Sequence, residues 1–594
     1  MSKAKRRSGG RAAAISIAVL GAMGWAAQVF GQSSWTGADG NSSWSDPGNW
    51  SPVGVPTGGT VNFVDTDGVG RTINYDDPSS RLFTLNVDLT DVGGSASNTI
   101  LISSNTLNLS TENVGTLGAG TINQSGGTQS FVGQNNSLSL GVNVGSIGDY
   151  SLSGGSLALA VTTTIQGDEA AGIEEVGQSG VGNFTQTGGS NQIGGASTLE
   201  LGVLGILELG VNPTGSGVYS LTAGSLTTVR TFGGSGPIHT GSEFVGYNGT
   251  GTFIQSGGTN SCTGSQGILY LAAGPGSIGN YTLSGGVLTA NNDGSNANVP
   301  NGAEIIGYNG IGTFSQSAGS NTLTGAAGNL YLGYNSTAAP PTQQDEFPTP
   351  ANSTGTYTLS GGTLTAVNEH IGYYGTGTFI QTGGSNTTNN LYLADGPNPA
   401  FTVPIQIQVG TYTLMGGTLS VAGTLTFGGV GSQSIGNLIL EGGVATIGTT
   451  SGRGQNISVT GNVGANTYGD LIITGNYTAG SGSLTLGIGG PASTGGFGHI
   501  DVLGTDSSFE KLNVVFLSGF QPAIGDTYDF LTAGNFTGGF SVNSPYPLEV
   551  NYSPTGVSLT VVPEPTGIGL LLCGMGLLSR RRGREELVGS APHA

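Results

Sequence analysis

The chain has 594 residues, of which 113 are glycine and only 8% are charged. Its apolar content of 36% is below the roughly 45–50% of an ordinary globular domain, so a single compact core is not expected. Lys and Arg number 14 against 34 Asp and Glu, and few of the basic residues lie outside the two termini. These few are Arg71, Arg81, Arg230, Arg453 and Lys511. Because they form no patch that could neutralise phosphates, nucleic acid is not expected as a partner.

The first 31 residues have the three parts of a secretory signal peptide. The basic stretch MSKAKRRSGGR precedes the apolar run AAAISIAVLGAMGWAA, and small residues follow near Gly31. Because the run is shorter than the ~20 residues that a membrane span needs, we expect residues 1–31 to direct export and to be cleaved. An uncleaved anchor is the alternative.

Residues 32–110 are expected to form an N-terminal β cap and the first strands. Trp35, Trp44 and Trp50 are three of the four tryptophans in the chain. Aromatic side chains at one end of a repeat array suit a cap that hides the unpaired edge of the first strand. A platform that stacks against carbohydrate rings is the alternative.

Residues 111–465 consist of repeats of one sequence unit. GTFIQSGGTNS at Gly251 returns as GTFIQTGGSNT at Gly377, and a variant, GNYTLSGGVL at Gly279, alternates with it. One aromatic or apolar position recurs with a mean spacing of about 32 residues, in the range of solenoids and arrays. This position is occupied by Ile122, Tyr150, Phe184, Tyr219, Phe253, Tyr281, Phe314, Tyr357, Phe379 and Tyr412.

Each unit has the pattern of short strands around a glycine corner. In residues 279–290 apolar and polar residues alternate, and a Gly-Gly pair interrupts the run where the backbone must bend or take a positive φ. A further short strand, such as LYLAA, precedes each unit. Three strands in roughly 32 residues predict an all-β fold, a parallel β-helix (solenoid) whose turns pair at about 4.8 Å. Propeller blades would need about 40 residues or more.

Two polar residue types recur inside the units. Glutamines lie two residues after the aromatic position and alternate with leucines of the other units; they are Gln124, Gln186, Gln255, Gln316 and Gln381. We expect them inside, where the open backbone at the Gly-Gly corner supplies amide partners; a sugar-binding row is the alternative. Glutamates that precede a glycine by three residues are Glu174, Glu243, Glu304 and Glu369. We expect these on a solvated face, too far apart to share one calcium ion.

Cysteine and histidine indicate no reactive centre. Cys262 stands alone once the terminal segment with Cys573 is removed, so we expect no disulfide framework and a thiol packed in a strand. His239, His370 and His499 are isolated along the chain, and His370 is expected at the surface. No P-loop, nucleophile elbow or Cys/His metal spacing occurs. We therefore expect no catalytic residues, no cofactor and no metal.

The last part of the chain changes character twice. Residues 466–561 are expected to form a small C-terminal β-domain, because the glycine repeat loosens there into strand patterns such as KLNVVFL. In residues 562–584 an apolar run lies between a Pro-Glu-Pro triplet and an arginine cluster, and residues 585–594 form a polar tail. In an exported chain, an apolar helix followed by arginines is a membrane-retention pattern with the arginines on the cytoplasmic side.

The order of these last parts resembles the PEP-CTERM sorting signal of exported bacterial proteins. The resemblance covers only the end of the chain and rests on Pro563, Glu564, Pro565, Arg580, Arg581 and Arg582. In that family a membrane enzyme, an exosortase, is thought to remove the segment and to pass the protein to the surface or the extracellular polymer. The tryptophan-rich passage resembles, more loosely, the openings of exported repeat proteins with PEP-CTERM or autotransporter-associated repeats.

The expected function is that of an exported structural or adhesive protein of the cell surface, outer envelope or extracellular matrix. Its expected partners are extracellular polysaccharide or matrix proteins, which a repetitive rod contacts weakly and many times. An exosortase-like processing enzyme and, before processing, the membrane around the C-terminal helix are the others. The alternative is a β-helix polysaccharide lyase or glycoside hydrolase, which needs clustered carboxylates or a basic residue. A cleft flanked by paired acidic side chains would favour that alternative.

Overall fold

The computed structural model describes a chain built almost entirely of β-strands. It describes residues 31–564, apart from 79, 91–95, 134, 160–169, 196–201, 233–241, 295–301, 335–352, 397–407, 429–433, 453–454, 466 and 479–481. Within these residues the helical elements are short 3-10 helices, at Pro47–Asn49, Ala492–Thr494 and Leu517–Gly519. None of the described helices is long and apolar enough to cross a membrane. The fold is all-β, as predicted, and its strands form long parallel sheets.

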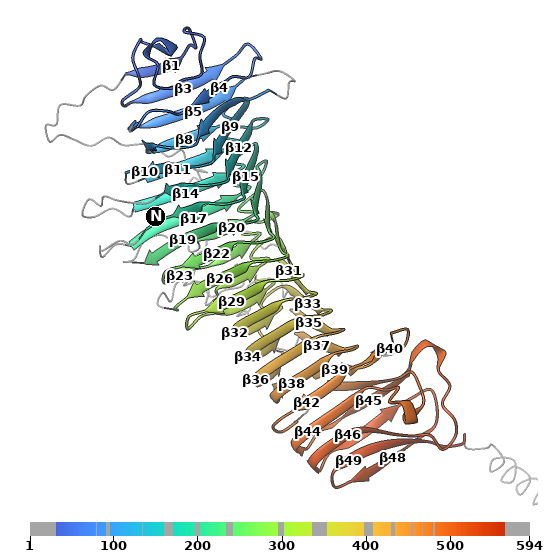
Figure 1. Cartoon of the computed structure of the whole chain (residues 1–594). Coiled ribbons are helices and arrows are strands. Elements are labelled where there is room, and N and C mark those ends of the chain that lie inside the picture. Colours follow the sequence, from blue (N-terminus) through green and yellow to red (C-terminus); the bar gives the residue numbers. More distant parts are fainter. Residues whose placement is uncertain are drawn as a thin grey trace, which may run out of the picture.

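Strands from successive units pair side by side in three parallel ladders (Figure 1). The first ladder contains β4 (Thr72–Asn74), β6 (Asn98–Ile102), β9 (Ala119–Gln124), β12 (Ile147–Leu152), β15 (Val181–Gln186), β18 (Ser216–Leu221), β21 (Thr250–Gln255), β25 (Ile278–Leu283), β28 (Ile311–Gln316), β31 (Thr354–Leu359), β33 (Thr376–Gln381), β35 (Val409–Leu414), β37 (Ile435–Leu440), β39 (Gln455–Val459), β43 (Gly482–Ile488), β45 (Phe509–Phe516) and β47 (Gly539–Asn543). At about 4.8 Å per strand, its seventeen strands extend over about 80 Å.

The second ladder receives the chain after each glycine corner. It contains β7 (Thr106–Leu109), β10 (Thr128–Phe131), β13 (Ser156–Leu159), β16 (Ser190–Ile193), β19 (Ser225–Phe232), β22 (Thr259–Thr263), β26 (Val287–Asn292), β29 (Ser320–Thr324) and the first halves of β32 (Thr363–Ile371), β34 (Ser385–Leu393), β36 (Thr418–Phe427) and β38 (Val444–Gly452). In these last four strands the chain passes into the third ladder without a break in strand structure.

The third ladder completes each unit. It contains β1 (Gln32–Trp35), β3 (Thr60–Asp65), β5 (Thr84–Leu89), β8 (Thr111–Val114), β11 (Asn135–Leu140), β14 (Ala170–Val176), β17 (Gly202–Leu209), β20 (Glu243–Val245), β24 (Leu269–Leu271), β27 (Glu304–Ile306), β30 (Asn329–Leu332) and the second halves of β32 to β38. Two short strands, β2 (Trp50–Ser51) and β23 (Gln266–Gly267), add antiparallel pairs beside the ladders.

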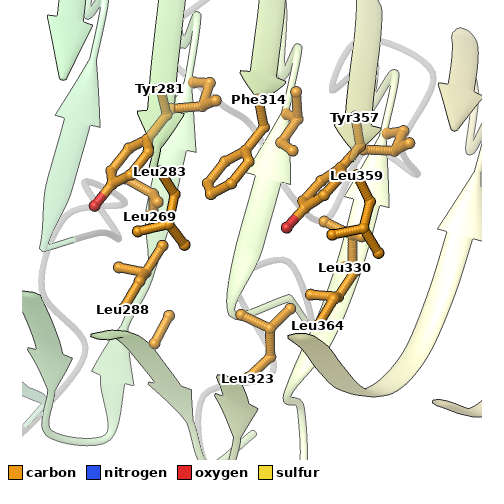
Figure 2. Packing of buried hydrophobic residues seen from close by; sticks show 14 of the residues in the cluster. Leu269, Tyr281, Leu283, Leu288, Phe314, Leu323, Leu330, Tyr357, Leu359 and Leu364 are labelled. Carbon is orange, nitrogen blue, oxygen red and sulfur yellow. The ribbon is translucent and has the colours of Figure 1, made fainter. Parts of the chain in front are cut away.

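The aromatic position predicted from the repeat sets the register of the first ladder. Each residue of this row is the pairing partner of the next, as in the pairing of Tyr281 with Phe314 and of Phe314 with Tyr357. The rings stack nearly parallel, with centroids 4.8 and 4.6 Å apart in these two pairs. Figure 2 shows the three rings side by side on successive strands, with Leu283 and Leu359 beside the tyrosines. The alignment of the units is therefore confirmed residue by residue.

The Gly-Gly pairs lie at the corner between the first and second ladders, as predicted. At Gly155 the backbone has φ 80°, and a Cβ atom would lie 2.4 Å from the carbonyl oxygen of Gly127 in the preceding unit. The corners stack so closely at Gly155 that a Cβ atom does not fit, and the positive φ also favours glycine.

The interior alternates apolar and polar residues, and it corrects one prediction. The glutamines of the repeat are at most 1% exposed, and their amides donate to backbone carbonyls, as expected; Gln186 Nε2 donates to Ser225 O at 3.0 Å. The prediction that the glutamates face solvent is wrong. Glu174, Glu243, Glu304 and Glu369 are all 0% exposed. They occupy the inward position of third-ladder strands, where glutamate alternates with leucine, as in Glu243 paired with Leu269.

The two ends of the array are closed differently. Trp35, Trp44 and Trp50 are at most 8% exposed and pack edge to face at 5.0 and 4.7 Å. Burial of all three rings is what a cap requires, and it leaves no open face for the alternative carbohydrate platform. At the other end, pairing continues through position 466 from β38 to β42 (Asp470–Ile473), β44 (His499–Asp506) and β46 (Thr527–Phe536). The antiparallel strands β48 (Leu548–Ser553) and β49 (Gly556–Val561) end the sheet.

The C-terminal part therefore continues the ladders that precede it. The expected C-terminal β-domain of residues 466–561 extends the first ladder through β43, β45 and β47 and the second ladder through β42, β44 and β46. A small antiparallel pair, β40 (Gly461–Asn462) with β41 (Thr467–Tyr468), lies at the junction. Residues 1–30, which include nearly all of the expected signal peptide, and residues 565–594, which include most of the expected terminal helix, lie outside the described residues.

Candidate functional site

The predicted sorting residues lie at the end of the described chain. Pro563 and Glu564 are exposed and follow β49 directly. The other members, Pro565, Arg580, Arg581 and Arg582, lie outside the described residues. The structure therefore describes only two of the six sorting residues, and the faces of the ladders offer the other candidate sites.

An aromatic row runs along the outer face of the third ladder. Strand pairing places Phe244, Tyr270, Ile305, Tyr331, His370 and Tyr392 next to one another in that order. The ring of His370 stacks between those of Tyr331 and Tyr392, with both centroid distances 4.5 Å. These residues point outward because side chains alternate between the two faces of a strand, and their neighbours in each strand point inward.

A second row of tyrosines flanks the first at the corner that follows each strand. Tyr334 stacks against Tyr308 and Tyr373 at 5.2 Å, and Tyr373 meets Tyr331 edge to face at 4.9 Å. These edge contacts leave Tyr331 only 5% exposed, and burial raises the pKa of Tyr373 to about 12. Ring stacking of this kind suits contact with flat apolar surfaces, and partly exposed members of the two rows are Tyr247, His370, Tyr373 and Tyr392.

His370 differs from the surface histidine that was expected. Its side chain is 13% exposed, and its Nδ1 lies 2.8 Å from Asp395 Oδ2. The two tyrosines that stack on its faces account for this burial. The pair supplies a carboxylate that orients the imidazole. The ring contacts Asp395 and the aromatic rings of Tyr331, Tyr373 and Tyr392.

Two glutamates continue the same outer row beyond its aromatic part. Glu175 pairs with Glu208, and Glu208 pairs with Phe244. Glu175 accepts hydrogen bonds from Ser139 Oγ at 2.7 Å and Gln178 Nε2 at 2.8 Å. Glu208 is only partly exposed, and burial, followed by the charge of Glu175, raises its pKa to about 8. Two adjacent carboxyl groups, one of them with a raised pKa, are among the elements of general acid and base chemistry.

The connections before and after the third-ladder strands vary most in length from one unit to the next. The Gly-Gly connection between β15 and β16 spans residues 187–189, whereas the connection between β19 and β20 spans 233–242. The connection from β30 to β31 spans residues 333–353. Connections that tolerate insertion carry much of the specific binding in proteins. This placement favours the third-ladder face as the functional one.

Other places in the described residues offer less chemistry. Among them, no group of three His, Cys, Asp or Glu side chains could hold a metal ion. A surface depression of about 520 Å³ lies beside the cap at Arg81 and Phe83, and one of about 500 Å³ lies between Phe516 and Tyr546. Neither is lined by the aromatic rows or by the glutamate pair. No family model and no curated protein matches the chain.

Sequence reasoning missed both the outer aromatic row and the glutamate pair. The strands concerned are short, such as Leu269–Leu271, and LYL alone does not show which residue faces outward. A usable signal was present in the alignment of the units, because the middle residues of EFV, LYL and EII fall at one repeat position. The thiol of Cys262, in contrast, was predicted correctly to pack in a strand, where it is 0% exposed.

Proposed function

We propose that this protein is an exported structural or adhesive component of the cell surface or extracellular matrix, built as a parallel β-helix with turns of about 32 residues. The observation that carries the proposal is the unbroken register of the first ladder across seventeen strands. An array of this kind repeats similar surfaces along its length and offers many weak contacts to a polymer or to neighbouring proteins. The partly exposed aromatic side chains of the third-ladder face are suitable contact residues for extracellular polysaccharide.

Sorting by a PEP-CTERM-like signal belongs to the same proposal. Pro563 and Glu564 are exposed beyond the last strand, a position that an exosortase-like membrane enzyme could reach. In this proposal the apolar segment and Arg580, Arg581 and Arg582 hold the exported chain at the membrane until the segment is removed.

The experiment is cell fractionation with intact-mass analysis of the native protein and of a Pro563→Ala, Glu564→Ala variant. The native protein is expected at the surface or in the medium without its arginine tail, and the variant is expected to stay in the membrane. A Pro545→Ala, Glu549→Ala variant is the matched control, because it changes exposed residues of the same two types nearby. If all three proteins keep the tail and fractionate alike, the sorting assignment is wrong.

A second candidate function is hydrolysis or lysis of extracellular polysaccharide, which the Glu175 and Glu208 pair favours. In this reading the protonated Glu208 is the general acid and Glu175 is the base or nucleophile. Release of reducing ends from extracellular polysaccharides would be measured for the native protein, for Glu208→Gln and for the control Glu549→Gln. Activity lost only in Glu208→Gln supports an enzyme. Absence of activity in all three, together with retained polysaccharide binding, supports the adhesive protein.

A further inference from the structure

A row of buried glutamates runs through the interior of the third ladder. Glu112, Glu174, Glu243, Glu304 and Glu369 lie on alternate units, are 0% exposed and are separated by leucines. Ionised carboxylates are rarely buried unless a cation pairs with them. Within the described residues, the ion pairs formed by basic side chains involve other acids, namely Asp65, Asp67, Asp395 and Asp501.

Each glutamate begins a hydrogen-bonded chain that crosses three units. Asn191 Nδ2 donates to Glu174 Oε2 at 2.9 Å and to the hydroxyl of Tyr219 at 3.2 Å. The hydroxyl of Tyr219 donates to Gln186 Oε1 at 2.6 Å. Gln186 Nε2 in turn donates to Ser225 O at 3.0 Å. The chain therefore links a carboxyl group, an amide, a phenol and a second amide to the backbone.

The same arrangement recurs along the array. The Asn Nδ2 to Glu Oε2 distance is 2.9 Å for Asn260 with Glu243, 2.9 Å for Asn321 with Glu304 and 3.1 Å for Asn386 with Glu369. The first glutamate is held by a glutamine instead, with Gln129 Nε2 2.6 Å from Glu112 Oε2. A contact repeated five times belongs to the design of the interior rather than to one irregular unit.

The chains leave two kinds of acceptor without a donor. Oε1 of Glu174, Glu304 and Glu369 has no partner, and neither has Oδ1 of the paired Asn191, Asn321 and Asn386. Both Nδ2 hydrogens of each asparagine are already used, one for the carboxyl group and one for the tyrosine. If the glutamate carries a proton on Oε1, this oxygen becomes a donor, and it can donate to the unpaired Oδ1 of the asparagine. A neutral carboxylic acid and a primary amide then make two reciprocal hydrogen bonds, so neither group stays unsatisfied.

The groups that face the glutamates carry no positive charge, and their hydrogen bonds to the carboxyl groups lower the glutamate pKa values less than burial raises them. Asparagine or glutamine from the second ladder and a tyrosine from the first ladder face each carboxyl group; Glu243 also meets Cys262 and Thr228, whose Oγ1 lies 3.4 Å from Glu243 Oε1. The facing tyrosines are Tyr150, Tyr219, Tyr281, Tyr357 and Tyr412, and burial raises the pKa of each well above its ordinary value. The thiol of Cys262 has a raised pKa for the same reason. All of these groups are therefore neutral near pH 7.

We propose that the five glutamates are neutral carboxylic acids in acid–amide pairs, and that these pairs are pH-sensitive locks that hold successive units together. When a lock opens, the carboxyl O–H bond breaks, its proton passes to water, and the amide loses its donor. The carboxylate then needs solvent, which it reaches only if the surrounding units separate.

Burial determines how the stability contributed by each acid–amide pair changes with pH. It raises the pKa of Glu112, Glu174, Glu304 and Glu369 to about 8 and that of Glu243 to about 7, from an ordinary value of 4.5. The folded chain therefore holds protons that the unfolded chain has released above about pH 4.5. The stabilising contribution of each pair is complete below that pH and is lost as the pH rises through about 7 to 8.

The test compares the melting temperature of the full chain between about pH 4.5 and pH 9 with that of a variant in which all five glutamates are glutamine. Glutamine keeps one donor and one acceptor in place of the neutral acid. We expect the melting temperature of the native protein to fall steadily over this range and that of the variant to fall clearly less, because only Glu208 and other groups outside the five pairs still release protons there. The control Glu549→Gln changes an exposed residue and should behave like the native protein. An equally steep fall in the five-site variant would overturn the proposal.

A second measurement keeps the proposal testable if the five-site variant does not fold. The infrared C=O band of protonated carboxyl groups is recorded at about pH 6 for the native protein and for Glu304→Gln alone. The native protein should show the band, although most of its carboxyl groups are ionised at that pH, and the variant should show it reduced. A native protein without this band has ionised glutamates, and the proposed locks do not exist.

Discussion

The hydroxyl of Tyr281 lies 2.6 Å from Gln255 Oε1, and the two side chains come from the adjacent strands β25 and β21. This bond explains why tyrosine units alternate with glutamine units along the sequence. A tyrosine needs an acceptor beside it, and the glutamine needs a donor, so neither unit can be stacked on a copy of itself. The alternation of phenylalanine with tyrosine therefore depends on the alternation of glutamine with leucine.

Tyr281→Phe should lower the free energy of unfolding by about 1–3 kcal/mol, because it leaves the buried Gln255 Oε1 without a donor. Adding Gln255→Leu, which reproduces the leucine of the alternate units, should recover part of this loss. The two single variants and the double variant would be compared by urea unfolding. Losses that simply add would show that the two side chains do not interact.

Phe314→Ala should be more damaging than the loss of one hydroxyl. Phe314 is 0% exposed and stacks on Tyr281 and Tyr357, so its removal leaves a cavity between two rings. A loss of about 3–5 kcal/mol is expected for a buried phenylalanine, measured as a lower urea midpoint. Phe314→Leu, which fills more of the space, should lose less, and an alanine variant with the native midpoint would contradict the packing described above.

Two glycines with similar positive φ, Gly155 in a Gly-Gly corner and Gly276 in the turn between β24 and β25, allow the effect of backbone conformation to be separated from that of close approach. Gly155 and Gly276 have φ values of 80° and 76°, but a Cβ atom meets Gly127 O at 2.4 Å in the first and nothing within 4 Å in the second. Gly276→Ala should therefore cost only the strain of a positive φ, on the order of 1 kcal/mol. Gly155→Ala should cost clearly more, because stacked corners must also move apart. Equal changes in melting temperature would mean that the corners do not stack tightly.

The sequence predicted the first ladder well and the third ladder poorly, for a physical reason. In the first ladder, six-residue strands such as β28 show the alternation of inward and outward side chains directly, and the glycine corner fixes where each strand ends. In the third ladder, β20 spans only Glu243–Val245, too few residues to show an alternation. Which face Glu243 occupies is decided by its neighbours Leu207 and Leu269 on other strands. The inward position of Glu243 and the outward positions of Phe244 and Tyr270 were missed for this reason.

The expected domain boundary at residue 466 rests on a pattern in the corners, whereas the sheets depend on the strands. Loss of the glycine repeat was interpreted as the start of a new domain, yet parallel pairing needs only main-chain groups in extended conformation. The pairing of Val444 with Asp470 and of Ile447 with Ile473 carries the sheet across this position without the repeat motif. The glycine repeat marks the corners between strands and not the strands themselves. The ladders therefore continue past residue 466, where the corners change.

Cys262 offers a local test of the proposed lock at Glu243. The thiol is 0% exposed and lies beside that carboxyl group, so a thiol reagent should label it only when the surrounding units open. With Cys573→Ser removing the other thiol, intrinsic reactivity should rise about tenfold per pH unit, because the reactive thiolate increases by that factor. Between about pH 6 and 8 the native rate should rise more steeply than this, since deprotonation of Glu243 adds opening. In Glu243→Gln the labelling rate should again rise about tenfold per pH unit. Equal slopes in the native protein and the variant would show that exposure of Cys262 does not depend on the protonation of Glu243.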